Sequence, residues 1–440
     1  MKEPSEVADT GLIRAIGVRG LSANVANNLV GSGIFVLPAV VAVILGASAI
    51  VAYIVCAIAI GLIGLTFSEA GSRVSAPGGT YAYAEAAFGP FVSFQSGVLF
   101  WLSQVGASAA VATVFAGSIA AIAPSLGGII PRAVILVILY GGLAVINIRG
   151  VRTGMDIVEV ITAAKLLPLI LLVVVGAFFV TPAHLAWKSM PTVAQIGSAS
   201  LVLIFAFVGV EGALTSSGEV KDPSRTVPRA ILIGLGAVSL LYIAIQLVAQ
   251  GVLGPDLALH QDAPLVAVAA RAFGPTGRIL LGVGAAISAF GYVSGDILTT
   301  PRLLFAFARD GFLPKRLATV DPRYHSPTAA IVVYATLTCV LAITGTFRTL
   351  VILSTVSVLI VYLITCLASI RLTRRDVRGD GPPFVLPGGP AIPLIACIVV
   401  AWMLTSASRR EFISVAVTLV VASILYMIRP RPGTAAGASG

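Results

Sequence analysis

The stretch NNLVGSGIFVLPAVVAVILG, residues 27–46, decides how the chain folds. It belongs to an apolar run long enough to cross a bilayer, for which a helix needs about 20 residues. Gly31, Ser32 and Gly33 nevertheless crowd its middle. Asn28 precedes them and a proline follows. Because glycine is the poorest helix former after proline, this run predicts a membrane-spanning helix that is interrupted halfway.

Composition places the whole chain in a membrane. Of its 440 residues, 58% are hydrophobic and 10% are charged, whereas a soluble chain carries about 25% charged residues. Apolar runs of about 20 residues recur along the sequence, a length that suits helices rather than the short alternating strands of a barrel. We therefore expect an all-α integral membrane protein with twelve transmembrane helices, at residues 18–44, 46–68, 88–122, 131–148, 156–180, 194–217, 228–252, 277–307, 327–346, 350–371, 390–407 and 411–428.

The basic residues predict the orientation of these spans. With an even number of spans and the N-terminus in the cytoplasm, 20 of the 28 Lys and Arg residues fall on the cytoplasmic side and 7 on the opposite side. Cytoplasmic loops carry the excess of Lys and Arg, so we expect both termini in the cytoplasm. The net charge of +10 then reflects orientation and contact with the anionic lipid bilayer, and we expect no nucleic acid partner.

A second interrupted span pairs with the first. The stretch LVLIFAFVGVEGALTSSGEV, residues 201–220, carries Gly209 and Gly212 on either side of Glu211. This sixth span matches the first if five helices are repeated in inverted orientation, and interrupted spans at matching positions mark a transporter's binding site. An interrupted helix frees N–H groups that attract a carboxylate and C=O groups that attract an ammonium. Alternatively, these glycines only let helices pack closely; their pairing beside Asn28 and Glu211 favours the binding site.

Four motifs, two of which overlap the interrupted stretches, occur in a specific order. They are VGSGIFVLP (30–38), APGGTYAYAEAAFGPFVSFQSGVLFW (76–101), FAFVGVEGALTSSGEVKDPSRTVPRAI (205–231) and PRLLFAFARDGFLP (301–314). Together they resemble amino acid permeases of the amino acid–polyamine–organocation (APC) superfamily, in the bacterial branch that contains the arginine/agmatine antiporter and proton-coupled permeases. The resemblance runs from about residue 11 to 372. It implies a secondary active transporter of the bacterial inner membrane that works by alternating access. It implies no cofactor besides the coupling proton, and the oligomeric state is either a monomer or a homodimer.

The resemblance also implies a fold of the leucine-transporter type. This is a five-plus-five inverted repeat in which helices 1 and 6 are broken at mid-membrane and helices 11 and 12 lie outside the repeat. The expected divisions are a cytoplasmic N-terminal tail, the first repeat, the second repeat, the last two helices and a cytoplasmic C-terminal tail, at residues 1–16, 17–180, 190–372, 389–428 and 429–440.

Where this sequence matches the family's motifs, the resemblance implies which residues bind the substrate. The amides of Ser32 and Gly33 match those that hold the substrate's α-carboxylate. The carbonyls of Phe205 and Val208, with Leu29 from the first span, match those that accept from its α-ammonium. Phe205 also falls where the antiporter has an aromatic gate over the substrate, although an ordinary core position is the alternative for this ring.

The pocket for the substrate side chain departs from the antiporter. Ser103, Gln104 and Ser108 on the third span match positions that surround the side chain. Asp296 on the eighth span falls where the antiporter carries an aromatic residue that stacks on guanidinium, which argues against arginine/agmatine specificity. A small, modestly polar lining fits small neutral amino acids and leaves cationic ones open.

Three ionisable residues stand out inside the predicted spans, since a charge at mid-bilayer costs about 2.5–3.5 kcal/mol. Lys165 matches a lysine of proton-coupled permeases; it either carries the proton or braces the first break through carbonyls. Glu211 either responds to pH as a buried carboxyl or holds the second break by hydrogen bonds. Asp296 either contacts a cationic substrate or pairs with a hydroxyl or with Lys165. Glu69, near the cytoplasmic end of the second span, is expected at the membrane interface.

These features predict proton-coupled uptake of L-α-amino acids. The alternatives on the same fold are an exchanger or exporter of basic amino acids or polyamines, and a sensor that binds without transport. We expect no enzyme and no metal site, since His184, His260 and His325 lie in separate predicted loops and the sequence lacks HExxH and GxxxxGK[ST] patterns. A channel does not need two broken helices around one occluded site.

Overall fold

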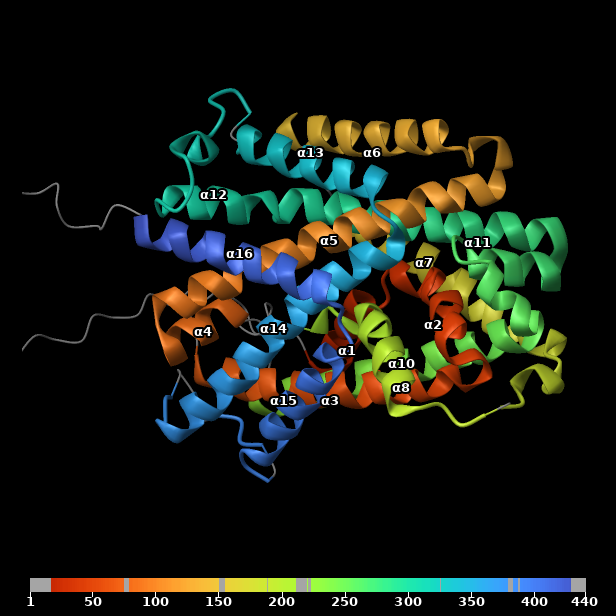
Figure 1. The fold of residues 1–440 in the computed structure, drawn as a ribbon, viewed down its shortest axis with the longest axis horizontal. Helices are drawn as coiled ribbons and strands as arrows, with labels where there is room; N and C mark the ends of the chain where they lie inside the picture. The colour runs from red at the N-terminus through yellow and green to blue at the C-terminus, as the bar shows by residue number, and fades with distance from the viewer. Residues whose placement is uncertain are drawn as a thin grey trace, which may run out of the picture.

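Every regular element of the described chain is a helix (Figure 1). This computed structural model describes residues 17–74, 79–149, 155–187, 189–210, 220, 223–324, 326–378, 383–386 and 388–428. The main helices of the first half are α1 (Val18–Leu29), α2 (Leu37–Leu45), α3 (Ile50–Arg73), α4 (Thr80–Phe88), α5 (Pro90–Ile122), α6 (Ile129–Arg149), α7 (Met155–Gly176) and α8 (Val193–Leu203). Those of the second half are α10 (Pro223–Leu253), α11 (Pro264–Thr299), α12 (Pro301–Arg309), α13 (Thr328–Thr344), α14 (Phe347–Arg374), α15 (Ala391–Leu404) and α16 (Arg409–Ile428).

The helices are long and apolar enough for a multi-pass membrane protein. Within the described ranges, seven helical segments could cross a membrane by length and composition, and four shorter apolar helices accompany them. They establish the all-helical membrane class. Their bounds differ from the expected spans in part, since Leu37–Arg73 joins parts of the first two expected spans and Pro264–Arg309 begins before the expected eighth. The count of twelve spans and the inverted repeat remain predictions.

One helix, α5, forms the centre of the bundle. Within its most apolar window 72% of residues are buried, against 11% for α16. It packs against α11, α13 and α14. The run ASAAVATVFAGSIAA, residues 107–121, consists mainly of small side chains, and small residues let helix backbones approach closely in membranes. By contrast, α16 lies at the edge of the bundle, and its outward side chains are mostly large and aliphatic.

Several helix boundaries differ from those expected. The third span is preceded by a separate short helix, α4, and α10 begins at Pro223 rather than at 228. The helix α11 begins at Pro264 and bends at Gly274, whose φ of 68° is left-handed, before the expected eighth span starts. Proline is accepted in the first turn of a helix, where its missing N–H has no partner. Pro223 and Pro264, which in sequence are equally typical of loops, therefore begin helices here.

The long helices run roughly side by side, so the molecule has two ends. In Figure 1, α4 and α12 lie toward the left end and the bend of α11 lies at the right end. We call the left end the inner end and the right end the outer end, following the orientation that the basic residues predict.

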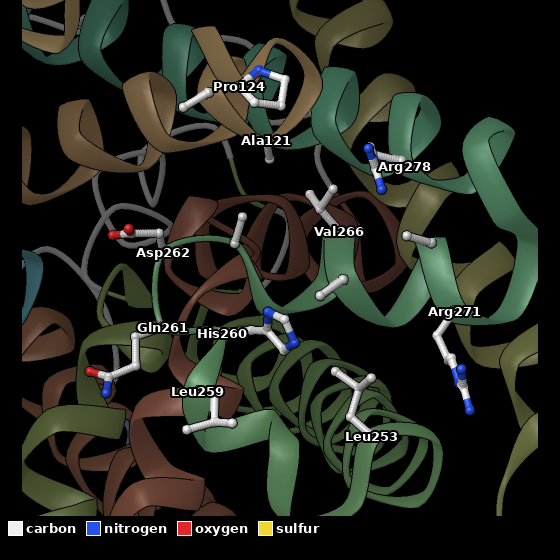
Figure 2. Close-up of a pocket in the computed structure, with 14 residues that line it drawn as sticks. Ala121, Pro124, Leu253, Leu259, His260, Gln261, Asp262, Val266, Arg271 and Arg278 are labelled. Atoms are coloured by element: carbon white, nitrogen blue, oxygen red, sulfur yellow. The ribbon is translucent and has the colours of Figure 1, made fainter. Parts of the chain in front are cut away.

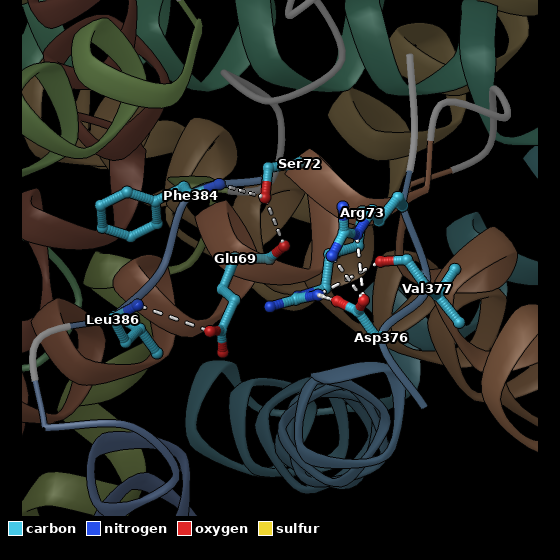
Figure 3. Close-up of polar contacts among 8 residues, drawn as sticks. Glu69, Ser72, Arg73, Asp376, Val377, Phe384 and Leu386 are labelled. Carbon is cyan, nitrogen blue, oxygen red and sulfur yellow. Dashed lines mark hydrogen bonds and ion pairs between the residues drawn. The ribbon is translucent and has the colours of Figure 1, made fainter. Parts of the chain in front are cut away.

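A buried polar cluster ties helices together at the inner end (Figure 3). Glu69 and Arg73, at the end of α3, are only 2% and 4% exposed. The Glu69 carboxylate accepts hydrogen bonds from the Ser369 hydroxyl at 2.9 Å and the Leu386 amide at 3.4 Å. Glu69 was expected at the membrane interface, and that depth stays a prediction. Within the protein its side chain is buried, and donors from α14 and from the chain after it bind its carboxylate.

Arg73 extends the same cluster. Its guanidinium donates to the Val377 carbonyl at 3.2 Å and lies 3.9 Å from the Asp376 carboxylate. We call Glu69, Arg73, Ser369, Asp376 and Leu386 the inner cluster. Because its members come from α3, α14 and the following segment, the cluster holds these three parts of the chain together.

Candidate substrate-binding site

The first membrane helix is interrupted between α1 and α2. Regular helix ends at Leu29, and Gly31 has extended backbone angles of −96° and −172°. A short 3₁₀ helix, η1 (Ser32–Phe35), follows. Ser32 and Gly33 are its first two residues, so their N–H groups have no acceptor within it. The interruption thus leaves the N–H groups of the two residues that the sequence predicts for the carboxylate site without an acceptor in the helix.

The second interruption follows α8. This helix passes into a 3₁₀ helix, η6 (Ile204–Phe207), after which Val208 is extended, with φ −70° and ψ 140°. Gly209 has a φ of 126°, a backbone conformation that side-chain-bearing residues rarely adopt. Glu211 and Gly212 lie outside the described residues.

The two interruptions are in direct contact. A Cβ added to Gly33 would lie 3.0 Å from Cδ1 of Phe205, and one added to Gly209 would lie 2.8 Å from the carbonyl oxygen of Asn28. Both glycines therefore allow a close approach that a larger residue would block. Gly33 and Gly209 therefore serve close packing, and the binding-site interpretation of the glycines stays a prediction.

A single tyrosine bridges the two interruptions. The hydroxyl of Tyr242 on α10 lies 2.8 Å from the carbonyl of Leu29 and 3.2 Å from that of Ala206. Its side chain is completely buried, and its one proton is shared between the two carbonyls. Sequence reasoning missed this residue. The available signal was a tyrosine in an apolar run, since a buried hydroxyl must find a partner.

Lys165 reaches the same region from α7. Its Nζ donates to the carbonyl of Asn27 at 2.7 Å, in the last turn of α1. An ammonium at the end of a helix interacts favourably with the unpaired carbonyls there. This position is the one that both interpretations of Lys165 require, and its role in carrying a proton stays a prediction.

Asp296 lies in a network of hydroxyl groups. It is 5% exposed and accepts hydrogen bonds from Thr300, at 2.5 Å, and from Tyr334. The side chains of Gln104 and Ser108 approach the same carboxylate. Of the alternatives drawn from the sequence, pairing with hydroxyls is the one observed, whereas Lys165 binds a backbone carbonyl instead. Contact between Asp296 and substrate stays a prediction.

Two hydroxyls in this region lack protein partners. The Oγ atoms of Ser32 and Ser103 are buried without a hydrogen bond to any described residue, while Ser108 pairs with Tyr140 at 3.2 Å. The segment η1 packs against both α5 and α11, which brings the first, third and eighth spans together. A buried hydroxyl without a partner costs about 1–3 kcal/mol, so these two atoms are suited to binding a polar ligand.

Aromatic rings cover the centre on its outer side. The ring of Phe205 meets that of Phe347, at the start of α14, edge to face with centroids 6.4 Å apart. Leu29 and Ser32 are each only 1% exposed. A solute therefore reaches the two interruptions only after these elements move. Phe347 is a second residue that the sequence did not reveal.

Two cavities open at the outer end. The larger, of about 750 Å³, lies between the end of α5 and the chain that enters α11. Figure 2 shows Asp262 and Arg278 on opposite sides of it, with His260 between them. The smaller, of about 240 Å³, is lined by Arg132, Asp262 and Phe347 among others. Neither is lined by Ser32 or Gly33, so both lie outside the covered centre.

Comparison with known proteins agrees with this geometry. The sequence pattern of the family described as "Amino acid permease" matches residues 16–428. The chain belongs to the amino acid permease family. This bears out the resemblance to the APC superfamily, and transporters rather than enzymes are its relatives.

The permease has full-length relatives in Bacillus subtilis. It is 27% identical to the serine/threonine exchanger SteT, over 94% of this chain and 95% of the relative. It is 23% identical to the branched-chain amino acid permease BcaP, over 96% and 94% of the two chains. It is also 26% identical to a methylthioribose transporter, over 92% and 90%. These relatives carry different solutes, so family membership leaves the substrate of this permease to be argued from its site.

Proposed function

We propose that this permease takes up L-α-amino acids together with protons, by alternating access. One observation carries the proposal: two interrupted helices touch in a covered interior. One interruption leaves the N–H groups of Ser32 and Gly33 without a helical acceptor, and one carbonyl from each interruption, Leu29 and Ala206, meets at the hydroxyl of Tyr242. An α-amino acid holds its carboxylate and ammonium on one carbon, so a single solute satisfies donors and acceptors together.

The side-chain pocket favours small neutral amino acids. The unpartnered hydroxyls of Ser32 and Ser103 suit a small polar or apolar side chain. Asp296 has its carboxylate engaged by Thr300 and Tyr334, which leaves little capacity for a cationic substrate. Two of the relatives are named for serine, threonine and branched-chain amino acids, which are all neutral.

Proton coupling rests on Lys165. Its Nζ is bound to the end of α1, next to the first interruption, so a change in its charge would act directly on the segment that holds the carboxylate. Buried ammonium groups lose their proton more readily than exposed ones. Glu211 is proposed as a second titrating group. We place the protein in the bacterial inner membrane with both termini in the cytoplasm.

Amino acid exchange is a second candidate, because one full-length relative is named as an exchanger. The test is flux into proteoliposomes that contain the purified protein. Under an inward proton gradient and with an empty lumen, we expect saturable accumulation of a labelled small neutral amino acid. Uptake that requires unlabelled amino acid inside would support exchange. Binding without flux would indicate a sensor, and flux that fails to saturate would indicate a channel.

The identity of the substrate is decided by competition. Each common amino acid is added in excess against one labelled substrate. We expect small neutral L-amino acids to compete and arginine, agmatine and D-enantiomers to fail. Strong competition by arginine would overturn the proposed neutral specificity and return Asp296 to a role in substrate binding.

A further inference from the structure

An ion pair stands at the outer end between two cavities. Nη1 of Arg132, in the first turn of α6, lies 3.8 Å from Oδ2 of Asp262, in the loop before α11. Asp262 lines both cavities, and Arg132 lines the smaller one. The loop is held in place because the carbonyl of Asp262 packs against Gly117 of α5, where a Cβ would lie 3.2 Å from it.

The smaller cavity leads toward the central site. Phe347 forms part of its wall. The ring of Phe347 meets the ring of Phe205, and Phe205 in turn lies against Gly33. These two rings therefore lie between the cavity and the amides of the first interruption. A solute that enters the cavity is next to the aromatic pair that covers the centre.

The chemistry of the ion pair suits a zwitterion. The side chains of Arg132 and Asp262 are 33% and 76% exposed, and exposed pairs of this kind contribute little to stability. Separating them therefore has little energetic cost. The carboxylate of an α-amino acid can take the place of Asp262 beside Arg132, while its ammonium binds Asp262. The cavity volume of about 240 Å³ is below the range of about 300–1,000 Å³ typical of drug-sized ligands, which suits a small amino acid.

We propose that the smaller outer cavity is a docking site, in which a zwitterionic amino acid binds between Arg132 and Asp262 before it passes Phe347 and Phe205. This inference rests on the proposed function, because it assigns the same substrate class to a second position. It makes Arg132 and Asp262 determinants of how fast substrate is captured, whereas the central amides determine how tightly it is held.

The test compares uptake with equilibrium binding in Arg132→Gln and Asp262→Asn. For each variant we expect KM for uptake in proteoliposomes to rise about 3–10-fold with Vmax within about 2-fold, because lost charge slows capture. Equilibrium binding of the same labelled amino acid to the purified protein is expected to stay within about 2-fold. Arg132→Lys should recover most of the loss, since it restores the positive charge.

Arg278→Gln is the matched control. It removes the same charge from the same end of the molecule, where Arg278 lines only the larger cavity, and KM should not change. Unchanged KM in both test variants would overturn the docking site, as would an equal rise in Arg278→Gln or a parallel loss of equilibrium binding. A wild-type protein that transports no amino acid would instead overturn the proposed function. If Arg132→Gln fails to fold, Asp262→Asn decides alone, because its side chain is exposed.

Discussion

Glu69 of the inner cluster and the central interruptions both bury polar groups in an apolar bundle, but the Glu69 carboxylate has protein partners whereas two central hydroxyls do not. Arg73 of the inner cluster also keeps its Nε without a partner among the described residues. At the inner end, the Glu69 carboxylate is held by a hydroxyl of α14 and by a backbone amide beyond it. At the centre, the hydroxyls of Ser32 and Ser103 have no partner among the described residues. The amides that begin η1 have no acceptor within their own helix.

From this difference we expect the inner cluster to stabilise the fold and the centre to bind the proposed ligand. A buried charge with several fixed partners stabilises one arrangement, and removing a partner leaves the charge uncompensated. Polar groups without partners cost free energy until something binds them. Changes in the inner cluster should therefore affect stability, and changes at the centre should affect binding and transport.

The largest expected effect comes from Ser32→Pro. Proline fits the first position of a helix, and the extended Gly31 before it is the conformation that a residue before proline prefers. The variant should insert and fold, yet lose the amide that holds the carboxylate, weakening equilibrium binding about 100-fold. Ser32→Ala, which keeps the amide, should cost about 5-fold or less. Near-normal binding in a folded Ser32→Pro protein would contradict the proposed carboxylate site.

Lys165→Ala should abolish accumulation driven by a pH gradient. Lys165→Arg separates the two roles of this residue, because arginine can still donate to the Asn27 carbonyl but does not release its proton. If Lys165 carries the proton, both variants lose accumulation in proteoliposomes. Recovery in Lys165→Arg would mean that the residue only braces α1. Accumulation that still follows the proton gradient in Lys165→Ala would show that coupling lies elsewhere.

Glu69→Ala should lower stability without changing affinity. Loss of its carboxylate leaves Ser369 and the Leu386 amide without their acceptor, for an expected loss of about 2–4 kcal/mol. Thermal unfolding of the purified protein measures this loss, and equilibrium binding should stay within about 2-fold. Glu85→Ala, at an exposed position of α4, is the control for charge. A strong loss of affinity in Glu69→Ala would contradict the expectation that the inner cluster affects stability and not binding.

Tyr242→Phe should weaken binding moderately, because it removes only the hydroxyl that bridges Leu29 and Ala206. We expect about 5–10-fold weaker binding, equivalent to about 1 kcal/mol for one buried hydrogen bond. Tyr53→Phe is the matched control: its hydroxyl is equally buried, but it donates to the Gln246 side chain at 3.1 Å rather than to a carbonyl of either interruption. Stability should fall in both variants, but affinity only in Tyr242→Phe. Equal binding in the two would mean that the bridge does not position the site.

The smallest effect is expected for Asp376→Asn at the edge of the inner cluster. Hydrogen bonding and charge from Arg378 hold the pKa of Asp376 below its ordinary value of 3.8. A lowered pKa means that this contact stabilises the fold above about pH 4 and is lost as the pH falls below it. Asp376→Asn should therefore lower the melting temperature slightly at pH 7 and not at all at low pH. A difference that persists below pH 3 would assign another role to this residue.

Much of the central site followed from local sequence because backbone conformation is a local property. Gly31, Gly33 and Gly209 predict helix breaks wherever they stand in an apolar run, and the breaks are observed at these positions. The helix starts at Pro223 and Pro264 were missed because proline signals either a loop or a first turn. Only the surrounding packing distinguishes the two.

The partners of the polar groups could not be predicted from local sequence in the same way. Tyr242, Phe347 and Tyr334 stand in or beside apolar runs with no motif of their own, and each acts on residues distant in the chain. From the sequence alone Glu69 is interpreted as an interfacial charge, and only the structure shows its contacts with Leu386 and Ser369. Such pairings depend on which helices become neighbours, which no local pattern encodes.

The sequence by itself determined that this protein crosses the membrane as helices, that two of them break, and which family it belongs to. Hydrophobic length and glycine placement suffice for this, since both act over a few turns of chain. Only the tertiary structure decided that the two breaks touch, that Tyr242 bridges them and that Asp296 binds hydroxyls. Contacts between distant segments are selected by the packing of the whole bundle, and that packing is where the binding site arises.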